Sequence, residues 1–217
     1  MHFQSQFSRP LFLSYLFIVA SISWFSCIRA QSQNQDRHVG GPCEGCEAVY
    51  EYSDRPLSSS ITLPGYDTAQ TKLIIYGVVF EKDGHTPADD VVLYFYHTDA
   101  NGIYQPSPGA RGWEKRHGAL RGWLRTDNNG AYEIKTNRPA SYPNRNIPAH
   151  IHVTIKEHGL TPYYITDYYY SDDPFLTDDQ RDPKNARGGS GVLHLIKNGV
   201  HWTGERNIIL GKNIPDY

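Results

Sequence analysis

Between residues 72 and 210, short segments rich in apolar residues recur along the chain, separated by polar segments that contain turn-forming residues. They are rich in β-branched and aromatic residues and comprise 72–80, 91–97, 120–126, 131–136, 150–156, 163–170, 192–196 and 207–210. Segments of this kind, separated by Gly, Asn and Asp, are typical of β-strands, and no window shows a sustained helical period. The pattern predicts an all-β fold: a single-domain β-sandwich of mainly antiparallel strands.

Two connecting segments have distinct predictions. The sequence Asp127-Asn128-Asn129-Gly130 contains residues that tolerate the positive φ of tight hairpin turns, so we expect the flanking segments to form a hairpin. The segment 171–190 is rich in Asp, Arg and Gly and predicts one long loop, a kind of loop that is often functional.

The N-terminal residues have a different pattern. Arg9 precedes an uncharged run from residue 11 to residue 25, shorter than the ~20 apolar residues of a spanning helix. We interpret 1–30 as a signal peptide, 31–48 as an N-terminal arm and 49–217 as the β-sandwich domain.

The sequence leaves three alternatives for the predicted signal peptide. They are secretion after cleavage at Ala30, lipid anchoring at Cys27 as in bacterial lipoproteins, and retention as an uncleaved anchor. Each predicts an exported protein, whether secreted, periplasmic or attached to the cell envelope.

Cys43 and Cys46 are separated by two residues. In a cytosolic protein this spacing would suggest a redox motif or half of a zinc site, but the chain has no second such pair. In an exported protein a structural disulfide that fastens the N-terminal arm is the favoured interpretation.

The balance of charged residues bears on which molecules the protein can bind. The chain has 21 Lys and Arg against 23 Asp and Glu, a formal net charge of -2, so nucleic acid is not an expected partner. Its 16 tyrosines favour strands and also carry phenols, which are candidate ligands.

His150 and His152 flank Ile151 in a predicted strand. Because alternate residues of a strand share a face, both imidazoles point to the same side and form a chelating pair for a transition metal. Tyr142 lies upstream, between prolines, and its phenol would ionise beside a strong cation. Two phenolates and two neutral imidazoles would suit a trivalent hard metal.

These residues resemble the signature of the intradiol ring-cleavage dioxygenases, which use non-haem iron(III). The similar elements are Asn101-Gly102-Ile103-Tyr104, Tyr142-Pro143 and Pro148-Ala149-His150-Ile151-His152, with 121–130 between the first two. The resemblance is strong over 73–155 and looser elsewhere.

The resemblance implies that Tyr104, Tyr142, His150 and His152 bind Fe(3+), with Tyr142 and His152 axial. A catechol would bind as a chelate, displacing Tyr142, which would take up a catechol proton. Reaction with O2 would then open the ring between the two hydroxyl-bearing carbons and give a muconate-type diacid. Relatives also suggest a homodimer.

One position departs from the family pattern. Ile147 stands where the family usually has an arginine that stabilises charge on the ring, and Arg145 is the candidate replacement. Two other hypotheses therefore stay open: a non-catalytic β-sandwich binding module that retains the metal site, and an exported zinc- or copper-binding protein that uses only His150 and His152.

Overall fold

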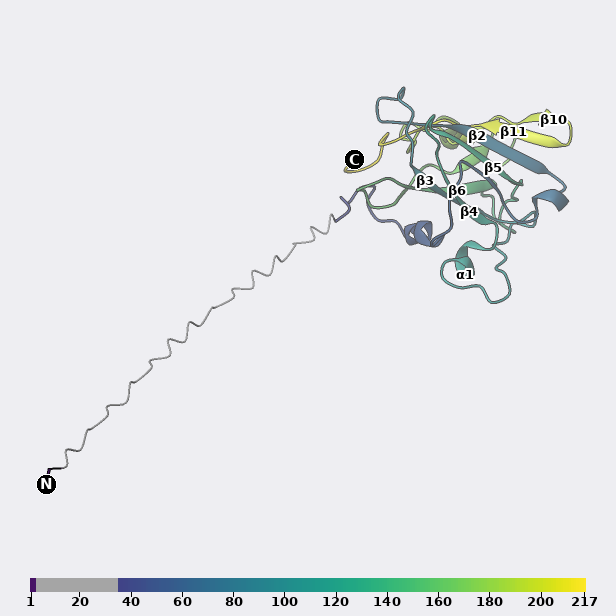
Figure 1. Ribbon diagram of the computed structural model, residues 1–217. Helices are drawn as coiled ribbons and strands as arrows, with labels where there is room; N and C mark the ends of the chain where they lie inside the picture. The colour runs from purple at the N-terminus through teal and green to yellow at the C-terminus, as the bar shows by residue number, and fades with distance from the viewer. Residues whose placement is uncertain (3–34) are drawn as a thin grey trace. The chain divides into compact units, whose positions relative to one another are not determined.

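The computed structural model describes residues 1–2 and 35–217 (Figure 1). The chain divides into two units, 1–33 and 34–217, and every described helix and strand lies in the second. Residues 3–30 of the predicted signal peptide, which include the predicted anchoring residue Cys27, fall outside the described residues. Among the residues that are described, no helix is both long and apolar enough to cross a membrane.

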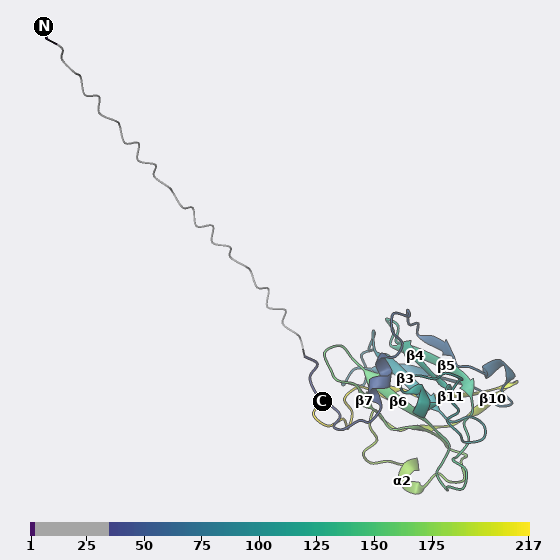
Figure 2. The ribbon, with the colours of Figure 1, turned by 90° about the horizontal axis from the view of Figure 1, so that it is seen from below.

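Two six-stranded sheets make up the domain (Figures 1 and 2). The first contains β1 (Ser60–Thr62), β2 (Lys72–Phe80), β5 (Ala131–Asn137), β10 (Ile196–Asn198), β11 (His201–Glu205) and β12 (Ile208–Ile209). The second contains β3 (Val92–His97), β4 (Arg121–Arg125), β6 (His150–Lys156), β7 (Tyr163–Tyr164), β8 (Tyr168–Tyr170) and β9 (Val192–Leu193). The short helices are η1 (Cys46–Tyr50), η2 (Tyr66–Thr68), α1 (Glu114–His117) and α2 (Asp178–Arg181).

Most strand pairs are antiparallel, the exceptions being β1–β5, β2–β11, β2–β12 and β8–β9. The main core lies between the sheets, where Leu73 and Ile75 of β2 share a cluster with Ile151, Val153 and Ile155 of β6. Each such side chain contributes about 1.5–3 kcal/mol when it leaves water, so the alternation of β6 is strongly enforced. The all-β sandwich predicted from the sequence is confirmed.

A second cluster covers the outer face of the β3–β4–β6 sheet. There Val92, Tyr94 and Trp123 pack with Ala48 and Val49 of η1. The indole Nε1 of Trp123 donates a hydrogen bond of 3.0 Å to the Ala48 carbonyl. Helix η1 thus covers part of the face to which His150 and His152 also belong.

The segment that leads into η1 is held at several points. The Gly40 N–H donates to the Pro215 carbonyl at 2.7 Å, and the Arg37 side chain donates to the Asp216 carbonyl at 2.6 Å. A disulfide joins Cys43 to Cys46. The two ends of the domain are therefore bound to each other.

The predicted hairpin at 127–130 is wrong. The turn exists, with Gly130 at φ 68° and its N–H donating to the Asp127 carbonyl, but β4 pairs with β3 while β5 pairs with β1 and β2. The turn chemistry is local, whereas the sheet that each strand joins depends on burial. The connection therefore crosses from one sheet to the other.

Other differences concern the ends and number of elements. The predicted strand 163–170 is divided into β7 and β8, and the predicted strand 192–196 into β9 and the start of β10. Strands β1 and β11 were not predicted. The expected loop 171–190 contains α2, which begins with a capping box between Thr177 and Gln180.

Candidate metal centre

Strand β6 presents its two histidines on the outer face of the second sheet. Their neighbours Ile151 and Val153 are 0% and 1% exposed in the main core, so the alternation leaves His150 and His152 on the opposite side. Opposite His152 in the register lies Tyr96 of β3, whose ring stacks on the imidazole with centroids 4.5 Å apart. The two imidazoles are thus carried by a rigid, central strand.

Tyr104 lies in the segment that follows β3. A turn precedes it, in which the Asp99 carboxylate accepts hydrogen bonds from the backbone of Asn101 and Ile103. Gly102 has φ 78°, and a Cβ there would lie 2.0 Å from the Ser141 carbonyl oxygen. Because only glycine permits this approach, the turn can dock against the segment that carries the second tyrosine.

Tyr142 lies one residue beyond that contact, in the connection between β5 and β6. The Ala140 N–H donates to the Asp99 carbonyl at 3.1 Å, and the Thr98 hydroxyl donates to the Ala140 carbonyl at 2.8 Å. These bonds join two segments that are distant in sequence. They bring both tyrosines to the histidine face of β6.

One polar side-chain atom from each of four residues takes part in a closed cycle of contacts, the ring of four atoms. The phenol oxygens of Tyr104 and Tyr142 are 2.8 Å apart, and the Tyr142 oxygen is 3.2 Å from Nε2 of His150. The Nε2 atoms of His150 and His152 are 3.2 Å apart, and Nε2 of His152 is 3.0 Å from the Tyr104 oxygen. All four residues named as metal ligands from the sequence are therefore brought together.

The hydrogen-bond partners of the two Nδ1 atoms determine which nitrogen of each imidazole carries the proton. Nδ1 of His150 is 2.7 Å from the Pro148 carbonyl, and Nδ1 of His152 is 3.0 Å from the Asp167 carboxylate. Both partners only accept hydrogen bonds, so each Nδ1 carries a proton. With both rings neutral, each Nε2 presents a lone pair to the ring of four atoms.

This arrangement has too few protons for its contacts. Two phenol protons serve four close contacts, so two of the contacts would place acceptor against acceptor. A cation at the centre removes the conflict, because four lone pairs can then point at one positive charge. Anionic phenol oxygens and neutral imidazoles suit a trivalent hard ion, so the residues present fit iron(III).

Burial controls the charge of these ligands. It raises the pKa of the Tyr104 and Tyr142 phenols, and it lowers the pKa of His150. Without a cation both phenols therefore stay protonated at neutral pH, and metal binding must release their protons.

The comparison with protein families decides the class of the protein. The family model Dioxygenase_C, described as Dioxygenase, matches residues 57–187, which include the whole ring of four atoms. The chain belongs to the intradiol ring-cleavage dioxygenase family. It is thus an enzyme of the ring-cleaving dioxygenase class.

Solved structures share the fold of this intradiol dioxygenase. The dioxygenase domain of a dioxygenase carbohydrate-binding protein fusion from Streptomyces sp. SirexAA-E is 22% identical, with a TM-score of 0.53; the match covers 82% of this chain and 97% of that domain. A catechol 1,2-dioxygenase from Acinetobacter sp. ADP1 is 21% identical, with a TM-score of 0.53, over 74% of this chain and 59% of that one. A 3-chlorocatechol 1,2-dioxygenase from Rhodococcus opacus 1CP is 24% identical, with a TM-score of 0.53, over 84% and 75%.

Asp167 is a site residue that sequence reasoning missed. Burial opposes its ionisation, but the hydrogen bond from His152 and the positive charge of Arg206 hold the pKa of the carboxyl below its usual value. With His150 and His152 it forms the one group of three His, Cys, Asp or Glu side chains among the described residues that are placed to hold a metal ion, their ligand atoms lying within 4.8 Å of one another. Because it already accepts from Nδ1 of His152, we interpret it as an outer partner that orients that ligand.

Asp173 was missed as well. Its buried carboxylate accepts the Ala149 N–H at 2.9 Å, immediately before β6 begins. It therefore fixes the start of the strand that presents both histidines. A single sequence marks neither aspartate, since both follow the histidines by many residues in an irregular region.

Arg145 lies in the connection that carries Tyr142. Its backbone N–H donates to the Tyr142 carbonyl at 3.2 Å, and its side chain is exposed. Ile147 is partly buried. The guanidinium lies near enough to oppose the rise in the Tyr142 pKa, although burial is the larger effect.

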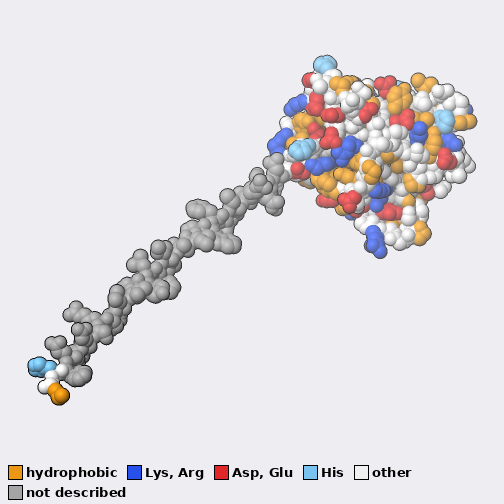
Figure 3. Space-filling view, viewed as in Figure 1, with side chains coloured by type: hydrophobic (Ala, Val, Ile, Leu, Met, Phe, Trp, Pro, Cys, Tyr) orange, Lys and Arg blue, Asp and Glu red, His pale blue; other side chains and the backbone are white. Residues whose placement is uncertain are grey.

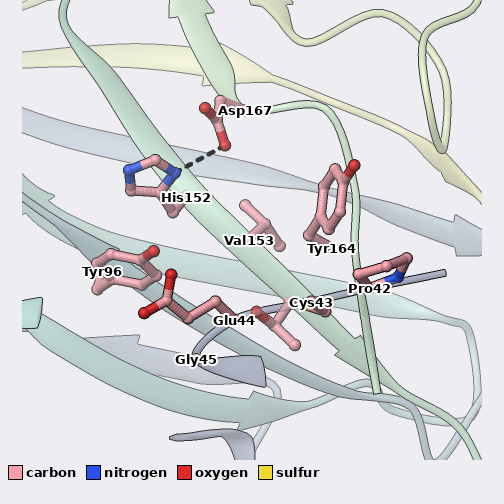
Figure 4. Close-up of a pocket in the computed structure, with 10 residues that line it drawn as sticks. Pro42, Cys43, Glu44, Gly45, Tyr96, His152, Val153, Tyr164 and Asp167 are labelled. Carbon is pink, nitrogen blue, oxygen red and sulfur yellow. Dashed lines mark hydrogen bonds and ion pairs between the residues drawn. The ribbon is translucent and has the colours of Figure 1, made fainter. Parts of the chain in front are cut away.

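A pocket of about 310 Å³ adjoins the metal centre (Figure 4). His152, Tyr96 and Asp167 line it on the sheet side. The other walls come from Tyr164 and from the N-terminal segment Pro42, Cys43, Glu44 and Gly45. Its volume is in the range of small-molecule sites, and it brings the disulfide-bonded segment next to a proposed ligand.

Proposed function

We propose that this protein is an exported iron(III) dioxygenase that cleaves catechol-like rings between the two hydroxyl-bearing carbons, using O2 and giving muconate-type diacids. The observation that carries the proposal is the ring formed by Tyr104, Tyr142, His150 and His152, which has four ligand atoms and two protons too few. The adjoining pocket supports a small aromatic substrate.

When bound, iron(III) supplies the charge that draws electron density from a catechol and makes it reactive toward dioxygen. The protein's own groups set geometry and protonation. The histidines are held in β6, whereas Tyr142 lies in an irregular connection; as the resemblance to the family implies, Tyr142 would accept a catechol proton on its phenol oxygen. Asp167 keeps the Nδ1 proton of His152 in place.

Arg145 is the last part of the proposal. It would stabilise negative charge on the bound ring, the role of the arginine that the family usually has where this chain has Ile147. Its exposed guanidinium influences the Tyr142 phenol. Arg145→Ala is expected to lower kcat by about tenfold with little change in iron content, since one charge-stabilising group is removed. Lys115→Ala, which removes an exposed charge from α1, is the matched control. An unchanged ring-cleavage rate in Arg145→Ala would exclude this role.

Metal loading tests the function directly. Metal-free protein is loaded separately with Fe(III), Zn(II) and Cu(II), and metal content, visible absorbance and O2 uptake with catechol are measured. We expect one iron per chain, a tyrosinate colour in the visible range and O2 uptake with iron alone. Iron-free, colourless protein after loading contradicts the proposal.

The other hypotheses predict different results in the same experiment. Colour without O2 uptake on any catechol supports a binding module that retains the metal site. Tight zinc or copper binding that persists in Tyr104→Phe supports a site built from His150 and His152, to which Asp167 could add a third ligand.

Export is part of the proposal. The disulfide between Cys43 and Cys46 supports an oxidising compartment. The N-terminus of the mature protein tests it: a chain that begins at residue 31 indicates secretion, and a lipid-modified Cys27 indicates an anchored lipoprotein. Sedimentation of the same material tests whether the enzyme is a homodimer.

A further inference from the structure

The charges that line the pocket beside the metal centre all have one sign. Its lining includes the carboxylates of Glu44 and Asp167 and no Lys or Arg side chain. The two carboxylates come from opposite sides: Asp167 precedes β8, whereas Glu44 lies between the disulfide-bonded Cys43 and Cys46 (Figure 4). In Figure 4 the Glu44 carboxylate is turned toward Tyr96, which stacks on His152.

Three arginines around the pocket do not line it and have partners of their own. Arg206 is 4% exposed and donates to the Thr166 and Gly189 carbonyls. Arg187 donates to the Gly40 carbonyl and lies 3.6 Å over the Tyr164 ring. Arg116 forms an ion pair with Glu44 outside the pocket. None of these arginines lines the pocket, so the Lys, Arg, Asp and Glu side chains in its lining are all acidic.

On the basis of the function proposed above, we propose that the pocket selects neutral or cationic catechols over catechols that bear a carboxylate, and that Glu44 is the residue that sets this preference. The face seen in Figure 3 does not supply it, because acidic and basic side chains are interspersed there. The discrimination arises in the pocket, where like charges repel.

Exposure limits the size of the effect. The Glu44 side chain is 74% exposed and its partner Arg116 is 62% exposed, so water and salt screen both charges. We expect the Kd of an anionic catechol to be about tenfold higher than that of a neutral one, and Glu44 to account for about threefold of this difference. Added salt should reduce it.

Three catechols of similar size and different charge test the preference: 4-methylcatechol, 3,4-dihydroxybenzoate and 4-(2-aminoethyl)catechol. Each is titrated into the iron-loaded full chain without O2 to obtain Kd by calorimetry, and kcat/KM is then measured with O2. We expect the benzoate to bind about tenfold more weakly than 4-methylcatechol, and the amine to bind at least as tightly.

Charge variants identify the residue responsible. Glu44→Gln should reduce the ratio between the neutral and anionic ligands about threefold. Arg116→Gln, which exposes the Glu44 charge, should increase that ratio. Glu47→Gln is the matched control, because Glu47 is an exposed carboxylate three residues further on that does not line the pocket, and the ratio should not change. Thermal unfolding checks that each variant is folded.

The outcomes separate this inference from the function on which it rests. Equal affinity for the three catechols, or a preference for the benzoate, overturns it even if all three are cleaved. An equal response of Glu44→Gln and Glu47→Gln overturns the role of Glu44. If none is cleaved, the proposed reaction fails, while the Kd values still decide the charge preference.

Discussion

Two pairs of tyrosines in this protein have nearly the same separation between phenol oxygens and different chemistry. Tyr132 and Tyr168 lie 2.7 Å apart in the main core, where Tyr132 donates to the Arg206 carbonyl and accepts from Tyr168. Tyr104 and Tyr142 lie 2.8 Å apart on the outer face of the second sheet, where two imidazole nitrogens are also close.

The difference is in the supply of protons. In the core pair each phenol proton has its own acceptor, so the pair is complete without any further group. In the outer pair two phenol protons are shared among four close contacts, so two contacts have no proton and the set is complete only with a cation. Burial alone does not distinguish a structural tyrosine from a ligand; the partners of its oxygen do.

The largest expected effect comes from Tyr104→Phe. It removes a ligand and one acceptor of the crowded ring, so the loss in kcat/KM and iron affinity should exceed the ~10–100-fold typical of losing an outer partner. The visible colour should disappear. The metal-free variant should be at least as stable as the parent in thermal unfolding. A coloured and active variant would refute the assignment.

A second prediction concerns His97, a buried histidine with complete partners. Its nitrogens contact the Thr98 carbonyl and the Thr136 hydroxyl at 2.7 Å each, and burial lowers its pKa to about 4. Between pH 6.5 and 4 the unfolded chain binds a proton that the folded protein does not. Stability should therefore fall as the pH decreases through this window, by up to about 3 kcal/mol.

Denaturant unfolding of the metal-free protein at pH 7 and pH 4.5 measures this change. His97→Gln keeps a hydrogen-bonding side chain but cannot take up the proton, so its stability should depend less on pH. His117, whose pKa burial also lowers to about 4, contributes equally to both proteins and cancels in the difference. Equal pH dependence in the two proteins would contradict the prediction.

Tyr132→Phe tests the complete tyrosine pair. The change leaves the Arg206 carbonyl and the Tyr168 hydroxyl without this partner, at a cost of about 1–3 kcal/mol in the free energy of unfolding. Iron content and colour should stay the same, the reverse of Tyr104→Phe. Loss of colour in Tyr132→Phe would remove the distinction between the two pairs.

The smallest expected effect is that of Asp167→Asn. The amide oxygen can still accept from Nδ1 of His152, but the negative charge is lost, so iron affinity should fall by about tenfold. Competition with a chelator measures it. Asp172→Asn is the control, since Asp172 pairs with Arg138 outside the ring of four atoms. Equal affinities would show that the negative charge of Asp167 does not contribute to iron binding.

The sequence predicted those parts of the site that depend on local pattern. Alternation in β6 placed His150 and His152 on one face, because Ile151 and Val153 must be buried. Tyr104 and Tyr142 were found by their resemblance to a family motif, since nothing in their own segments shows that they meet. Their meeting depends on the close contact between Gly102 and Ser141.

Long-range contacts account for what the sequence did not predict. Asp167 reaches the centre from an irregular segment, and Glu44 reaches the adjoining pocket from the N-terminal arm; no periodic pattern connects either with β6. The hairpin prediction failed for the same reason: Gly130 forms the turn, but the strands on either side join different sheets.

The bonds from Gly40 and Arg37 to Pro215 and Asp216 bear on the order of synthesis. The four proposed ligands lie between residues 104 and 152, whereas the arm that carries the pocket wall 42–45 is also bonded to residues 215 and 216. The arm therefore gains these bonds only after residue 216 has been made. A chain synthesised as far as residue 152 already contains all four ligands, while its pocket wall still lacks these bonds.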